Sequence, residues 1–458
     1  MGRVSKKQKI FLALSPTGYN IAGSIIGGSL LKFYTDFIGL GPLVFGLAYF
    51  LYGIWNTIND PLIGYYSDKV KPKGKKGKRL PFIRRSFPVA SIGMLLMIFV
   101  VPTWDDFFIF MILVIGLFIY DLAVTFHFIN FNALTVTLTE DQTERASINM
   151  ITSIIGLIPG AVAGLIPFFF LTGDYSIEFV VLLFLIVLIA GMSVTTIAVF
   201  SIKEPSGIYR DQTTTLPIKE AVKEVFKSKA FICLTITSFA MSGIGGAFSS
   251  TVLYLISDVY RLSEFPAVLP ATIAGLAQII TMPIIIKINK KLGVRSTLFI
   301  VLVIMLVGFV GMFFVPPYPI MIFFYWCILT GFFGNGVLTT AANGDIIDED
   351  ELKTGERREG MFFGIGAILT IPASSIFVLF FTLFLSAFGY DGTLEEQLPE
   401  TLFGIQLGFS LFPMIFLAIA AIMLYFYPLH GEYYKEMKLK VRELFEKKFN
   451  QLNEINEQ

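Results

Sequence analysis

Charged residues, and the residues that build metal or disulfide sites, are scarce in this 458-residue chain. Lys, Arg, Asp and Glu together make up 15% of the sequence, and there are two Cys and two His. Both cysteines, Cys233 and Cys327, lie in apolar stretches, so we expect neither a disulfide framework nor a metal cluster. The sequence holds no HExxH or GxSxG motif and no His-rich stretch, which argues against an enzyme and against a bound cofactor.

Apolar residues, in contrast, are in excess. Hydrophobic side chains make up 55% of the chain, with 48 Phe, which is more than the core of a soluble protein of this length holds. A helix that crosses a bilayer needs about 20 mostly apolar residues. We therefore predict an all-α membrane protein with twelve spans. They are 11–37, 42–66, 82–102, 107–138, 147–172, 177–202, 230–258, 266–288, 295–315, 318–346, 358–388 and 401–428.

Basic residues alternate between the gaps that separate these spans. Arg261 is the one Lys or Arg in the gaps after spans 1, 3, 5, 7, 9 and 11. The termini and the other gaps hold 28 of the 35, and five more lie at the span ends that adjoin those gaps. Positively charged loops stay in the cytoplasm. We therefore expect both termini there, in a multi-pass protein of the cell membrane.

The longest inner connection divides the twelve spans six and six. We expect an amino-terminal half at 1–202, a cytoplasmic linker with an interfacial amphipathic helix at 203–229, a carboxy-terminal half at 230–428 and a cytoplasmic tail at 429–458. PLIGYYSDK after span 2 and PIIIKINKKLGVR after span 8 both place Pro before basic residues. Two similar six-helix halves are typical of the major facilitator fold.

Polar residues inside span 2 form a candidate site. Asn56, Asn59 and Asp60 stand at i, i+3 and i+4, so they share one helix face. An acid at membrane depth is costly and is a functional-site candidate by default. Three oxygen-bearing side chains suit a hard cation. A hydrogen-bond cluster that holds helices together is the alternative.

Span 4 carries a second polar face. Asp121, Thr125 and Asn132 lie on it, and Asp121 falls near the expected bilayer midplane. Such an acid is either protonatable, with a role in coupling or solute binding, or fixed in a hydrogen bond to a neighbouring helix. Both interpretations stay open. His127 lies off this face, and we expect a structural role for it.

Charged residues also stand near the span ends. Lys32 and Asp36 are spaced i, i+4 near the outer end of span 1, which predicts a local salt bridge with a snorkelling lysine; drawing in solute is the alternative. The inner loops TEDQTER and GDIIDEDELKTGERREG carry both signs of charge, which either lock the halves together or are solvated surface. The candidate gate residues are Asp68, Glu144, Arg145, Asp345, Asp348, Glu351, Arg357 and Glu359.

Several of these segments resemble the glycoside–pentoside–hexuronide:cation symporter family, to which the melibiose permeases belong. The similar stretches are YTDFIGL (34–40), NDPLIGYYSDK (59–69), TEDQTER (139–145), DIIDEDELKTGERREG (345–360) and YPLHGEYYKE (427–436). The resemblance implies twelve helices in two halves, a central cavity and alternating access driven by a cation gradient. It also implies that the charged inner loops act as a gate.

The resemblance further implies a cation site. The family's sodium site falls on Asn56, Asn59, Asp60 and Thr125, although Asn56 stands where melibiose-type members have a second Asp. That departure removes one formal charge from the site. It makes H⁺, Li⁺ or a weakly bound Na⁺ candidates for the coupling ion.

The solute positions depart further from the melibiose-type members. Asn20 and Phe128 replace two aspartates, and Ser153, Asn132 and Ile371 replace an Arg, a Trp and a Lys. These residues and Asp121 form the candidate lining of the solute cavity. The vertebrate lysolipid symporters are similar in the NDP element and have a different cavity.

The sequence thus predicts a secondary active symporter in which Asp60 is the main cation ligand. We expect a glycoside or other sugar-type solute, with an amphiphilic or other organic solute as the alternative and a uniporter as a weaker one. The partners would be the solute and the lipid bilayer, not nucleic acid, and the protein would work as a monomer. A channel is less favoured, because the polar residues form a mid-depth cluster rather than rings along the helices.

Overall fold

The computed structural model describes residues 4–70, 77–138, 168–204, 223–356 and 358–457, with a few further positions between 148 and 166. Every regular element in these ranges is a helix, which confirms the all-α class. Nine of the described helices are long and apolar enough to cross a membrane, as expected for a multi-pass protein. They are Lys6–Gly28, Leu80–Ile98, Asp106–Thr135, Ile177–Ser201, Lys229–Val259, Glu264–Phe313, Tyr318–Thr354, Met361–Ala387 and Pro399–Tyr425.

The number of spans and the side of the termini stay predictions. α4 (Pro42–Lys69) has 28 residues, enough to cross, but is not among the nine because polar residues interrupt its second half. α11 (Glu264–Phe313) contains Gly293, whose φ of 79° and ψ of 169° break the helix where the sequence predicts two separate spans. The predicted span 147–172 and linker 203–229 lie mostly outside the described residues.

The chain forms two compact units. Unit 1 contains Met1–Thr213, Gly246–Leu269 and Ser374–Phe409, and unit 2 contains Thr214–Gly245, Pro270–Ala373 and Ser410–Gln458. This grouping follows other boundaries than the predicted halves at 1–202 and 230–428, and that division stays a prediction.

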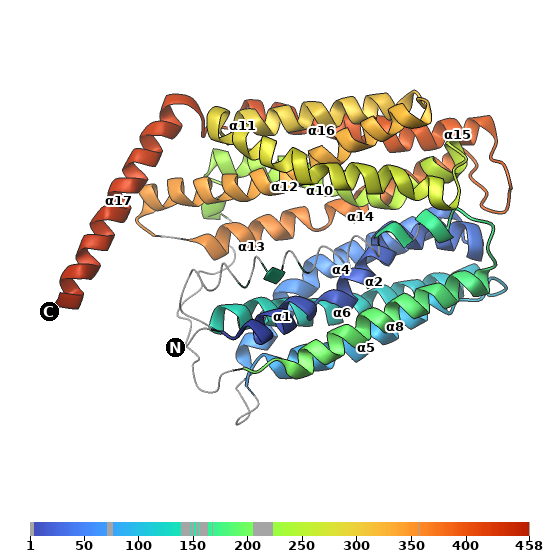
Figure 1. Cartoon of the computed structure of the whole chain (residues 1–458), viewed down its shortest axis with the longest axis horizontal. Coiled ribbons are helices and arrows are strands. Elements are labelled where there is room, and N and C mark those ends of the chain that lie inside the picture. The colour runs from blue at the N-terminus through green and yellow to red at the C-terminus, as the bar shows by residue number, and fades with distance from the viewer. Residues whose placement is uncertain are drawn as a thin grey trace. The chain divides into compact units, whose positions relative to one another are not determined.

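Unit 1 packs its helices closely at glycines. Figure 1 shows α5, α6 and α8 side by side. A Cβ atom on Gly93 of α5 would lie 2.7 Å from the backbone nitrogen of Tyr120 on α6, so only glycine allows this approach. The elements of this unit are α1 (Lys6–Leu14), α2 (Thr17–Gly28), α3 (Leu30–Lys32), η1 (Phe33–Ile38), α4, α5 (Leu80–Ile98), α6 (Asp106–Thr137), α8 (Ile177–Ser201), η3 (Leu255–Val259), α14 (Ala373–Ala387) and α15 (Pro399–Gln406).

Unit 2 is held together by one apolar cluster that includes the tail. Phe231 and Ile346 are buried together with Met437 and Val441, so the first turns of the tail helix pack into the unit. Its elements are most of α10 (Lys229–Tyr254) and of α11, then α12 (Tyr318–Thr354), α13 (Glu359–Thr370), α16 (Phe412–Tyr425) and the tail helix α17 (Gly431–Glu457); η4 (Leu407–Leu411) precedes α16.

Candidate functional site

α4 and α6 bring four predicted polar side chains into one hydrogen-bonded group in unit 1, here called the α4–α6 cluster: Asn59, Asp60, Asp121 and Thr125. The Asn59 Nδ2 group donates to Asp121 Oδ2 over 3.0 Å and to Thr125 Oγ1 over 2.9 Å. The Thr125 hydroxyl in turn donates to Asp60 Oδ1 over 2.8 Å. Two acids from different helices are therefore joined through one amide and one hydroxyl.

The local sequence places these side chains. Asp121 and Thr125 are one helical turn apart on α6, so both face the same side of the helix. Trp55 of α4 stacks on Phe118 of α6, with ring centroids 5.0 Å apart and planes within 8°, which aligns the two helices next to the cluster. Pro61 lies inside α4 and has no N–H, so the helix lacks one backbone hydrogen bond beside the cluster.

The α4–α6 cluster is buried, and the described residues provide no basic partner for it. Asn59, Asp121 and Thr125 are 1%, 3% and 4% exposed, whereas Asp60 is partly exposed. In the described part of the chain, neither acid forms an ion pair with Lys, Arg or His. A buried carboxylate is costly without a compensating positive charge. The cluster therefore has the charge and the oxygen ligands to attract a cation.

The number of acids bears on the kind of cation. Within the described ranges, no three His, Cys, Asp or Glu side chains gather in a way that would hold a metal ion. Two carboxylates with one amide and one hydroxyl form an all-oxygen set, which is harder than the nitrogen and sulfur ligands of most transition-metal sites. The arrangement thus suits a hard cation rather than a transition metal.

The remaining predicted residues lie outside this cluster. The side chain of Asn56 hydrogen-bonds to Tyr52 instead. Of the predicted solute residues in unit 1, Asn20 and Phe128 are partly exposed and Asn132 is exposed. Ile371 is partly exposed in unit 2, and Ser153 lies outside the described residues. The structure therefore joins three of the four residues predicted for the cation site, and it brings one predicted solute residue, Asp121, into the same group.

His127 occupies a packed position in unit 1. Its side chain is fully buried, and its ring stacks on Phe131 with centroids 5.9 Å apart and planes within 9°. Nε2 lies 3.4 Å from Ser15 Oγ, while Nδ1 has no hydrogen-bond partner among the described residues. Burial and ring stacking support a structural role for His127, which stays a prediction.

A second charged group in unit 1, the Lys32 cluster, contains Lys32, Asp36, Tyr254, Asp258 and Tyr390. The Lys32 ammonium lies 2.6 Å from Asp36 Oδ2 and 3.1 Å from Asp258 Oδ2. It also lies over the Tyr254 ring, 4.6 Å from the centroid. The Tyr390 hydroxyl donates to Asp36 Oδ1 over 2.8 Å. Lys32 is only 2% exposed, so its charge is neutralised inside the protein.

Both acids of the Lys32 cluster lie on π-helical turns. Asp36 belongs to η1 and Asp258 to η3. Such turns are rare and are frequent at functional sites. Sequence analysis predicts the Lys32–Asp36 pair from its i, i+4 spacing but not Tyr254, Asp258 or Tyr390, because no local pattern links residues so far apart in the chain.

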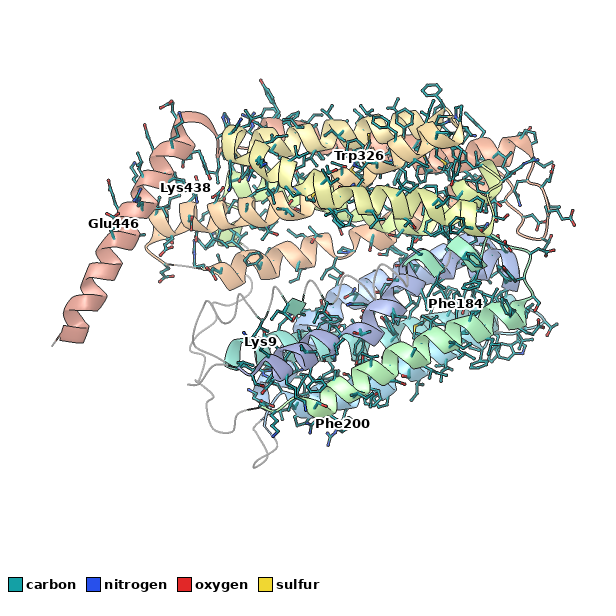
Figure 2. The ribbon with its side chains drawn as sticks, in the orientation of Figure 1. Lys9, Phe184, Phe200, Trp326, Lys438 and Glu446 are labelled. Atoms are coloured by element: carbon teal, nitrogen blue, oxygen red, sulfur yellow. The ribbon has the colours of Figure 1, made fainter. Side chains whose placement is uncertain are left out.

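The predicted gate residues of unit 2 contact the tail helix. Lys438 of α17, labelled in Figure 2, places its Nζ atom 2.6 Å from Asp345 Oδ1 and 2.8 Å from Asp348 Oδ2 on α12. Burial lowers the pKa of Lys438, but the hydrogen bonds to these two carboxylates outweigh it and raise the pKa overall. The Tyr433 hydroxyl donates to Glu349 Oε1 over 2.6 Å, which raises the pKa of Tyr433 to about 12.

The other gate residues are only partly described. Arg358 Nε donates to Asp350 Oδ2 over 2.8 Å, and its Nη1 lies 3.9 Å from Glu224 Oε2. Glu351 is buried and Glu359 is exposed. Glu144, Arg145, Arg357 and the side chain of Asp68 lie outside the described residues. Pairing of charges across the two halves therefore stays a prediction.

Unit 2 also contains a cavity of about 230 Å³ between α10, α12 and α13. Phe231, Phe362 and Phe363 give it an aromatic lining. Its polar groups include Thr235, Ser238 and Asn343. A mostly apolar cavity with a few hydroxyl and amide groups suits an organic molecule rather than an ion.

Comparison with known proteins places the chain among transporters. A family model described as MFS/sugar transport protein matches residues 11–431. The "uncharacterized symporter YnaJ" of Bacillus subtilis (strain 168) is 24% identical, covering 96% of this chain and 95% of its own. The "glucuronide carrier protein homolog" of Escherichia coli (strain K12) is 23% identical and covers 94% of each chain. The "sodium-dependent lysophosphatidylcholine symporter 1" of Xenopus tropicalis is 27% identical over 34% of this chain and 30% of its own.

A solved structure supports the same placement at the level of the fold. The inward-facing, unoccupied structure of a bacterial homologue of the human lysosomal transporter Spinster superposes with a TM-score of 0.67. The match covers 93% of this chain and 97% of the other, at 16% sequence identity. At that identity the likeness shows the fold alone.

Proposed function

Because the chain belongs to the MFS/sugar transport protein family, we propose that it couples the movement of a sugar-type solute to a gradient of Na⁺ or H⁺. It is a multi-pass membrane protein and a transporter rather than an enzyme. Relatives that cover nearly the whole chain are symporters and sugar carriers, which makes it a solute symporter at the coarser level. The ion, the solute and the residues that bind them form the proposal.

The α4–α6 cluster is the observation that carries this proposal. Two acids at membrane depth, without a basic partner in the described part of the chain, are unfavourable unless a cation or a proton joins them. Asp60 is the partly exposed member, so it is the group that a cation reaches first. Asn59 and Thr125 add oxygen atoms to the proposed site. Asn56 is proposed as a neighbouring ligand.

Transport is proposed to proceed by alternating access between two six-helix halves, with both termini in the cytoplasm. The Lys32 cluster joins the start of the chain to segments that begin at Gly246 and Ser374. In this mechanism Lys32 separates from Asp258 when the outer side opens. Asp36, four residues along the same helical stretch, stays beside the lysine and keeps its charge balanced. The charged inner loops are proposed to part when the inner side opens.

The solute is proposed to be of glycoside type, since the relatives that cover more than 90% of the chain include a glucuronide carrier homologue and an isoprimeverose transporter. Asn20, Phe128, Asn132, Ser153 and Ile371 are proposed to line its path. An amphiphilic solute is the second candidate. The aromatic cavity of unit 2 and the partial match to a lysophosphatidylcholine symporter favour it.

A ligand screen by thermal unfolding tests the proposed function. A ligand that binds only the folded protein stabilises it, by about 2.7 kcal/mol at a hundredfold excess over Kd. Purified protein would be heated with glycosides, hexuronides or lysolipids, each in NaCl or choline chloride and at pH 5.5 and 7.5. The proposal predicts that one solute class raises Tm, and does so more in Na⁺ or at the lower pH. Stabilisation by a solute that is independent of both ion conditions would contradict coupling.

A further inference from the structure

Two independent observations, one from the sequence and one from the structure, point to a role for Asp121 in the cation site. The sequence has Asn56 where the resemblance implies a second acid, so the proposed site on α4 holds one carboxylate, Asp60. The structure brings another carboxylate to the same group from α6, because Asp121 Oδ2 accepts a hydrogen bond from Asn59 Nδ2 over 3.0 Å. Asp121 stands one helical turn from Thr125, the residue that holds Asp60.

We propose that Asp121 supplies the second carboxylate of the cation site, so that the site takes one alkali-metal cation between α4 and α6. From the sequence alone, Asp121 has three possible roles: coupling, solute binding, or a fixed hydrogen bond between helices. This inference rests on the proposed function, because it assigns a ligand to the same site. It assigns Asp121 to the cation site instead of the predicted lining of the solute cavity.

The burial of Asp121 and its contacts favour a role in ion binding over a role in solute binding. Asp121 is 3% exposed, and its hydrogen bond goes to Asn59, a member of the proposed cation site. Tyr49, Tyr52 and Tyr120 lie near the carboxylate. A solute enters and leaves in each cycle and needs an accessible partner. A small cation needs only a path through Asp60, the partly exposed acid.

Charge supports the same assignment. Two carboxylates that share one amide and one hydroxyl bring two negative charges into a region of low dielectric. The structure offers neither acid a Lys, Arg or His partner among the residues it describes. One alkali cation would lower the net charge of the site to minus one and provide an attraction to both helices. The ion would then tie α4 to α6.

The test is ion binding, measured apart from transport. Purified protein would be titrated with Na⁺ and Li⁺ at constant ionic strength with choline, and both Tm and the apparent ion Kd would be recorded. Mutation of a residue that hydrogen-bonds to a metal ligand typically weakens the site by about 10–100-fold. We expect Asp121→Asn to raise the Kd at least that much, and the double variant Asn56→Asp/Asp121→Asn to recover most of the loss by returning an acid to α4.

Controls separate this inference from the proposed function. Asp60→Asn should abolish the ion-induced rise in Tm, and Asp106→Asn, at the exposed start of α6, should leave it unchanged. If Asp60→Asn loses ion binding while Asp121→Asn keeps it within about twofold, Asp121 is only a bond between helices and the inference is overturned. If the unaltered protein and Asp60→Asn respond alike to Na⁺ and Li⁺, the proposed cation site itself is wrong. Should Asp121→Asn fail to fold, Asp121→Glu supplies the readout, because a longer acid should change the ratio of Na⁺ to Li⁺ affinity, and an unchanged ratio would contradict the assignment.

Discussion

The ammonium of Lys32 lies 3.1 Å from the carboxylate of Asp258, although the two residues are 226 positions apart in the sequence. Within unit 1 this contact joins the last residue of α3, directly before η1, to the turn η3. Lys32 is 2% exposed and the Asp258 side chain 17% exposed, so water screens the pair little. The pair is therefore a structural link whose removal leaves buried charge behind.

Replacement of Lys32 by Met should destabilise the protein strongly. The variant leaves Asp36 and Asp258 without their cation, and loss of one partner of a buried ion pair costs about 3–5 kcal/mol. Thermal unfolding in detergent measures the effect as a lower Tm. Arg261→Met is the matched control, because Arg261 and Glu396 also form an ion pair in unit 1 but are 61% and 69% exposed. An exposed pair contributes about 0–1 kcal/mol. Equal Tm losses in the two variants would show that burial of Lys32 does not matter.

Replacement of Lys438 by Met should release the tail helix. Lys438 binds Asp345 and Asp348 together, and without it two carboxylates of α12 lose their cation. Limited proteolysis should cut α17 sooner in the variant than in the unaltered protein. Lys435→Met is the control, since Lys435 is 72% exposed and its ion pair among the described residues is with Glu432 of the same helix. Cleavage at the same rate in both variants would contradict the docking role.

The same contact predicts little pH dependence near neutrality. The folded protein raises the pKa of Lys438 above its ordinary value of 10.5. A raised pKa of a basic group stabilises the folded state fully below the unfolded pKa, and the effect is lost only as pH rises through the folded pKa. The proteolysis rate of α17 should therefore stay constant between pH 6 and 9 as far as Lys438 is concerned, and should rise only in strongly alkaline buffer. A marked rise near pH 7 would point to another group.

Replacement of His127 by Phe should preserve coupled transport. The ring is fully buried and stacks on Phe131, and its Nε2 atom has only a long contact of 3.4 Å to Ser15. A phenyl ring keeps the stacking and removes both nitrogens. Solute uptake would be recorded as a function of pH for the variant and the unaltered protein. A shifted or lost pH optimum in the variant would give His127 a role in coupling that packing does not explain.

Some of this architecture follows from local sequence pattern. Asn59 and Asp60 stand at i+3 and i+4 from Asn56, which predicts one polar helix face, and the i, i+4 spacing of Asp121 and Thr125 predicts another. The break at Gly293 is also predictable, since the run from 264 to 313 is too long for one span. Periodicity does not say which faces meet. The direct bond from Asn59 to Asp121 needs the packing of α4 on α6, which only the structure supplies.

Local sequence patterns do not predict contacts between distant segments, because tertiary packing determines those contacts. The spacing of Lys32 and Asp36 predicts their pair, but Asp258 joins it through tertiary packing that no local pattern encodes. For the acids of α12, the sequence predicts the residues but not the residue with which they pair. The sequence predicts Asp345 and Asp348 as charged gate residues. Both form ion pairs in unit 2 with Lys438 of the tail, which lies 90 positions beyond Asp348.

Uptake by proteoliposomes that contain the Asp60→Asn variant tests the central claim most directly. With an inward gradient of Na⁺ or H⁺, the unaltered protein should accumulate its solute above the outside concentration. The variant should lose that accumulation and retain downhill flux or exchange, because the solute path remains while the ion ligand is gone. Accumulation by the variant to the same level as the unaltered protein would contradict the role of Asp60 in coupling.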